Sequence, residues 1–155
     1  MSPRAWRSLF TVAGVGLSAA LAVAAVPISV KDVKVTEKTS SVGTTKGNKY
    51  LTVQFTTTVN EAVPKLMTVK VKSACKAGDK SVEAENSGLG SGIDKVDKGG
   101  SKDVSVPLYM STGLPAKPQS CEFTFTYGKV TSKTGDHVGD FCWDGGATAK
   151  EGHCK

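Results

Sequence analysis

Residues 121–130 read CEFTFTYGKV, the stretch of the chain with the clearest strand pattern. Its cysteine and its aromatic residues fall on alternate positions: Cys121, Phe123, Phe125 and Tyr127. Successive side chains of a strand point to opposite faces, so this spacing gives one apolar face and one polar face. Aromatic and β-branched residues also favour the extended conformation. The stretch predicts a half-buried strand that carries a cysteine on its core-facing side.

The same alternation recurs on the amino-terminal side of this stretch. It predicts further strands over residues 27–38, 50–59, 65–76 and 103–110, and a weaker one over 81–85. The apolar phase slips between Val30 and Val33, which indicates a bulge or a change of partner. Nothing after residue 25 has the apolar stripe of a helix. We expect an all-β domain, an antiparallel β-sandwich of about seven strands that is immunoglobulin-like in the loose sense.

Two regions lack a strand pattern. Residues 86–102 hold five glycines and no aromatic residue, and we interpret them as a long flexible loop. Residues 132–155 are also glycine-rich, and we expect a disulfide to shape this tail more than regular structure does.

Four cysteines follow the amino-terminal segment, and an even number indicates two disulfides in an oxidising compartment. Cys142 and Cys154 enclose a short glycine-rich loop whose ends meet easily. Cys75 and Cys121 both lie in the apolar phase of their strands, so both point into the core. We therefore pair Cys142 with Cys154, and Cys75 with Cys121 across the body of the domain.

Residues 1–25 have the order of a secretion signal. Arg4 and Arg7 precede an uncharged apolar run that ends in small residues. This predicts a cleaved signal peptide over 1–25 and a single secreted domain over 26–155, with no membrane span after cleavage. The alternative is an uncleaved anchor, because the uncharged run from Ser8 to Val30 is long enough to cross a bilayer.

The charge pattern argues against nucleic acid as a partner. Both arginines lie in the predicted signal, and without them the formal net charge falls from +6 to +4. Arginine supplies the planar fork that grips phosphates and base edges, so a domain without it is a poor candidate for nucleic-acid binding.

Catalytic motifs are lacking. The chain has only two histidines, His137 and His153, and no G-x-S-x-G elbow. A metal site built from Cys142, Cys154 and His153, with His137, has no recognised zinc spacing, and we expect neither a metal nor another cofactor. We therefore predict that the protein is not an enzyme and has no catalytic residues.

The candidate binding residues are Trp143, Tyr109, Lys70 and Lys72. Trp143 lies in the small disulfide loop, and Tyr109 is out of phase with the apolar face of its strand. Exposed aromatic groups on a rigid loop are good recognition groups. The alternative for Trp143 is that it packs in a small core at one end of the sandwich.

We expect a secreted, periplasmic or cell-surface binding module whose partner is an extracellular protein or a glycan. One alternative is a structural subunit of an extracellular fibre, coat or matrix. That subunit would self-associate through its amino-terminal strand, residues 26–38. A further alternative is a small secreted enzyme inhibitor.

Overall fold

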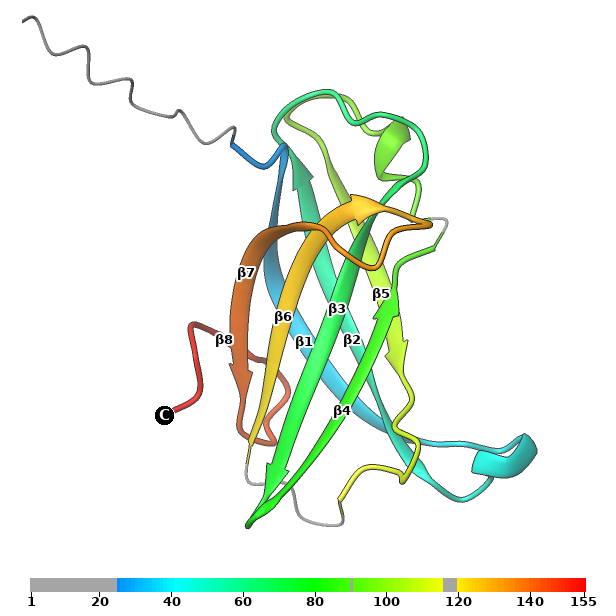
Figure 1. Ribbon diagram of the computed structural model, residues 1–155. Coiled ribbons are helices and arrows are strands. Elements are labelled where there is room, and N and C mark those ends of the chain that lie inside the picture. Colours follow the sequence, from blue (N-terminus) through cyan, green and yellow to red (C-terminus); the bar gives the residue numbers. More distant parts are fainter. Residues whose placement is uncertain (1–24, 90, 116–119) are drawn as a thin grey trace, which may run out of the picture.

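A computed structural model describes residues 25–89, 91–115 and 120–155 of the chain. Two antiparallel sheets face each other in a sandwich-like arrangement (Figure 1). Within the described part, regular structure is limited to strands and two short 3-10 helices, so the prediction of an all-β fold is confirmed. The predicted signal, up to Ala24, lies outside the described residues, and no described helix is long and apolar enough to cross a membrane.

Each sheet is a series of antiparallel neighbours. The three-stranded sheet has the order β1 (Ile28–Thr39), β2 (Lys49–Val59) and β5 (Ser101–Leu108). The five-stranded sheet has the order β4 (Lys80–Ser87), β3 (Met67–Ala77), β6 (Ser120–Lys129), β7 (Asp136–Trp143) and β8 (Lys150–Glu151). The two 3-10 helices, η1 (Gly43–Thr45) and η2 (Ile93–Lys95), interrupt loops.

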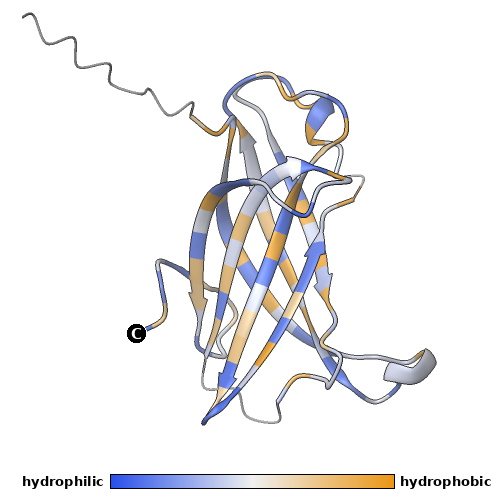
Figure 2. Ribbon diagram, viewed as in Figure 1, coloured by the Kyte–Doolittle hydropathy of each residue, from blue (hydrophilic) through white to orange (hydrophobic). Residues whose placement is uncertain are grey.

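The core lies between the two sheets and follows from the alternation of the strands (Figure 2). Phe55 of the three-stranded sheet packs edge-on against Phe125 of the other sheet, with ring centroids 4.9 Å apart. Phe125 in turn meets Phe141 of β7 in a second edge-on contact at 5.3 Å. The first contact joins the two sheets and the second lies within the five-stranded sheet, and all three aromatic side chains are almost fully buried.

Short contacts connect the sheets along both edges of the sandwich. On one side, the backbone of Ala147 and Ala149 bonds to Val35 and Val33, around an isolated bridge between Lys34 and Thr148. On the other side, the Asn86 amide donates to the Pro107 carbonyl at 2.7 Å. The slip predicted between Val30 and Val33 is a bulge, with a register shift between Lys31 and Lys34.

Both predicted disulfides are present, but one lies elsewhere than expected. Cys75 and Cys121 are direct cross-strand partners on the neighbouring strands β3 and β6, with Cα atoms 4.0 Å apart. The bridge is buried, as predicted, yet it lies within one sheet and does not cross the domain. Strand phase correctly indicated that both cysteines lie on the core-facing side of their strands. It could not indicate that these two strands are neighbours in one sheet.

The tail is more regular than expected, so its interpretation as a disulfide-shaped segment was wrong. Residues 136–143 form the full strand β7, which pairs with β6 and places Phe141 in the core. A register shift at Phe125 and Thr126 interrupts the alternation that sequence reading depends on.

The loop over residues 86–102 is also anchored. Ile93, in the short helix η2, is completely buried in the core, so this segment is not simply a flexible loop.

Candidate functional site

The outer face of the three-stranded sheet carries an aromatic pair, of which Tyr109 is exposed and Tyr50 is half-buried. Tyr50 and Tyr109 lie at the adjoining ends of β2 and β5, with ring centroids 4.5 Å apart and planes tilted by 30°. Tyr109 is 53% exposed, as expected for a side chain that is out of phase with the apolar face of its strand. Because Tyr109 is the most exposed aromatic residue of the described chain, this pair is the clearest surface for stacking a ligand.

A polar hollow of about 440 Å³ lies on the same sheet. Its outward-facing side chains come from three adjacent strands: Lys34, Gln54, Thr56, Asp103 and Ser105. The Thr56 hydroxyl donates to Asp103 across the strands at 2.8 Å. Gln54 is four residues from Tyr50, or about 13 Å along the strand. The aromatic pair and the hollow therefore lie on the same outer face of the sheet, and the hollow offers hydroxyl, amide, ammonium and carboxylate groups.

Lys72 and Lys70 differ, although both side chains lie on the outer face of the five-stranded sheet. Lys72 is exposed and forms an ion pair with Glu83 at 3.4 Å. Lys70 is only 5% exposed, because the turn between β6 and β7 folds over it. Its ammonium group donates to the carbonyls of Ser132 and Thr134. Lys70, a candidate binding residue from the sequence, is therefore not accessible to a partner, and its charge is used within the domain.

Trp143 is also not on an exposed loop. It is the last residue of β7, is 4% exposed, and its indole N–H donates to the Gly146 carbonyl. This is the packed alternative considered for Trp143, and it leaves no free indole face for a partner. Of the four candidate binding residues, Tyr109 and Lys72 remain accessible, and they lie on different sheets.

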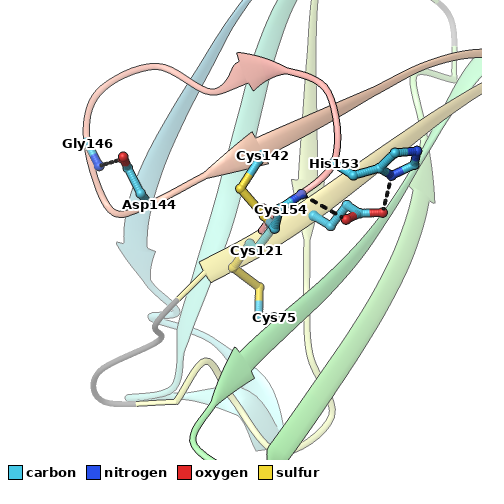
Figure 3. The surroundings of a disulfide bond; sticks show 8 residues. Cys75, Cys121, Cys142, Asp144, Gly146, His153 and Cys154 are labelled. Carbon is cyan, nitrogen blue, oxygen red and sulfur yellow. Dashed lines mark hydrogen bonds and ion pairs between the residues drawn. A yellow bond between two sulfur atoms is a disulfide. The ribbon is translucent and has the colours of Figure 1, made fainter.

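A second cluster lies on the outer face of β6 and β7, beside the disulfide between Cys142 and Cys154. Cys142 and Cys154 bond to each other, so neither thiol is available as a metal ligand. Both histidines of the chain nevertheless meet carboxylates there (Figure 3 shows His153 beside the disulfide). The members of this histidine–carboxylate cluster are Glu122, His137, Asp140 and His153.

The bulge in β7 puts two of these residues on one face. Asp140 and His137 are three positions apart, so strict alternation would place them on opposite faces of the strand. Asp140 pairs with Thr124 and His137 with Thr126, and the register shift absorbs the additional residue between them. Both side chains therefore face outward, and His137 Nε2 lies 2.8 Å from Asp140 Oδ2.

The disulfide brings the tail to the same place. Glu122 pairs with Cys142 on the outer face, and the bond from Cys142 to Cys154 holds the tail over β6. His153 then contacts two carboxylates: Nδ1 is 3.0 Å from Glu122 Oε1, and Nε2 is 3.5 Å from Asp140 Oδ2. The other Glu122 oxygen accepts the backbone N–H of Cys154 at 3.2 Å.

The electrostatics of the cluster follow from these contacts. The hydrogen bond from His153 lowers the pKa of Glu122, although partial burial opposes this. The same hydrogen bond raises the pKa of His153, with a further contribution from the charge of Asp140. Both directions reflect the mutual stabilisation of a protonated His153 and an ionised Glu122.

Sequence reasoning missed this cluster. It considered the histidines as metal ligands only together with Cys142 and Cys154, which form a disulfide. Glu122, in the middle of the clearest strand, received no role. The available signal was that the outward positions of that strand include one carboxylate.

Comparisons with protein-family models, with curated proteins and with solved structures found no match to this chain. The functional argument therefore depends on the surfaces described above.

Proposed function

We propose that the chain is an exported, non-enzymatic binding module that recognises an extracellular glycan through the outer face of its three-stranded sheet. The observation that carries this proposal is the placement of the Tyr50–Tyr109 pair and the polar hollow on one face. The scaffold is immunoglobulin-like in the loose sense of a two-sheet sandwich that presents one binding face.

The chemistry of the face suits a polyhydroxylated ligand. A sugar ring has an apolar face that can stack on an aromatic side chain, and Tyr109 offers such a surface at low cost in conformational entropy. Gln54, Thr56 and Ser105 supply donors and acceptors for hydroxyl groups. Lys34 and Asp103 add charge-assisted hydrogen bonds, which are the stronger kind.

Two independent features of the chain support export. The segment over residues 1–25 has the pattern of a secretion signal. The four cysteines form two disulfides, and such bonds persist in oxidising compartments. A module outside the cell would meet glycans of the envelope or of the surroundings.

Binding to a panel of soluble and insoluble polysaccharides tests the proposal. We expect at least one to retain the protein, and we expect Tyr109→Ala to weaken that binding about tenfold, as loss of a stacking anchor does at other interfaces. Leu89→Ala is the matched control, because it removes an exposed apolar side chain from a loop elsewhere and should leave binding unchanged.

Affinity that is equal in the wild type and in Tyr109→Ala would contradict this assignment of the binding face. Retention by a purified protein partner and by no polysaccharide would contradict the assignment of the ligand. Circular dichroism of both variants checks that the fold is intact.

A further inference from the structure

The histidine–carboxylate cluster is separate from the glycan-binding face, because it lies on the five-stranded sheet. It combines two imidazoles and two carboxylates from three segments: β6, β7 and the tail. The chain has no other histidine, so both of its histidines lie in this cluster.

We propose that Glu122, Asp140 and His153, with His137 beside them, bind a divalent transition metal of the zinc class. One ligand atom from each of Glu122, Asp140 and His153 lies within 4.8 Å of the others. Two ligands that are each about 2.1 Å from a tetrahedral zinc ion lie about 3.4 Å apart. The distance of 3.5 Å from His153 Nε2 to Asp140 Oδ2 is close to that spacing, and the 3.0 Å contact to Glu122 is made by the other ring nitrogen, Nδ1.

The cluster is also held in place from outside. The second oxygen of Glu122 accepts the Cys154 N–H, which leaves the first oxygen facing His153. The disulfide between Cys142 and Cys154 fixes the tail next to β7. Such supporting contacts orient metal ligands and reduce the conformational entropy lost on binding.

The donor set selects among metals. Imidazole nitrogen with carboxylate oxygen suits zinc and its neighbours, whereas calcium and magnesium prefer oxygen alone. His153 is 70% exposed and Asp140 only 14% exposed. A metal ion would therefore reach the site from the solvent side and contact the less exposed Asp140 carboxylate. The bound ion would tie the tail to β6 and β7 as a second fastening beside the disulfide.

Calorimetric titration of the EDTA-treated, disulfide-bonded protein with Zn²⁺ tests this inference. We expect saturable binding of one ion per chain, and a higher midpoint of thermal unfolding when Zn²⁺ is present. His153→Gln and Asp140→Asn should each lower the affinity at least tenfold and remove the thermal shift. Glu151→Gln is the matched control, because it removes a neighbouring exposed acid outside the cluster.

His153 is exposed, so its replacement should leave the metal-free fold unchanged, and circular dichroism checks this. The inference fails if no saturable binding occurs, if both variants bind Zn²⁺ as the wild type does, or if excess Ca²⁺ displaces Zn²⁺. None of these outcomes depends on whether the protein binds a glycan.

Discussion

Two of the candidate binding residues, Lys70 and Trp143, are buried and are therefore not available to partners. Lys70 and Trp143 both have polar groups that suggest recognition, but each donates to backbone carbonyls of a turn that covers it. The turn over Lys70 approaches closely because Gly128 and Gly135 have no side chains. A Cβ atom at Gly128 would lie 2.7 Å from the Thr134 carbonyl oxygen. Lys70 therefore stabilises a turn of the domain.

Replacing Lys70 with alanine should lower the free energy of unfolding by about 2 kcal/mol. The change removes charged hydrogen bonds to Ser132 and Thr134 and leaves those carbonyls without that donor. Lys72→Ala is the control, since an exposed ion pair contributes about 0–1 kcal/mol. Urea denaturation measures both, and equal losses in the two variants would contradict the assignment.

At the scale of elements, local alternation identified most strands but not the features that depend on neighbouring strands. Residues 50–59 and 121–130 alternate cleanly and appear in β2 and β6. Strand β7 was missed because its bulge breaks the alternation, and the pairing with β6 that stabilises it is not local. The same bulge brings His137 and Asp140 together, so the histidine–carboxylate cluster could not be predicted either. Strand phase placed Tyr109 outside the core, but it could not show that the turn between β6 and β7 covers Lys70.

The segment between β4 and β5 provides a prediction at this scale. Ile93 in η2 is fully buried, so Ile93→Ala should cost about 3 kcal/mol of stability through lost burial and a cavity. Lys95→Ala, on the exposed side of the same turn, should cost little. Chemical denaturation gives the stabilities, and limited proteolysis within residues 86–102 gives a second readout.

The wild-type segment should resist cleavage, and Ile93→Ala should be cut more readily because its anchor is lost. Rapid cleavage of the wild type would instead support the flexible loop expected from composition.

At the scale of the whole molecule, β1 is part of the sandwich. It pairs with β2 along most of its length and buries Ile28, Val33 and Val35. Its other edge is bonded to residues 147–149 around the bulge. The sequence suggested an alternative in which a fibre assembles through this strand. Such assembly would have to use the part of this edge that residues 147–149 leave free, or displace those residues.

Deleting residues 26–38 should therefore abolish folding and not merely self-association. The deletion removes three core side chains and exposes the β2 edge to aggregation. Circular dichroism and size-exclusion chromatography of the deleted form, beside the intact protein, measure this outcome. A soluble, folded monomer after the deletion would show that β1 is a detachable assembly strand.

The bridge between Lys34 and Thr148 joins one of the first strands to be synthesised to one of the last segments. During synthesis, β1 emerges long before residues 147–149 exist to cover its edge. Contacts between residues so far apart in sequence form slowly, because closing the intervening chain costs entropy first. The domain therefore completes its sandwich only after residues 147–149 have been synthesised. Until then, β1 is a sheet edge that the cell must keep from pairing with other chains.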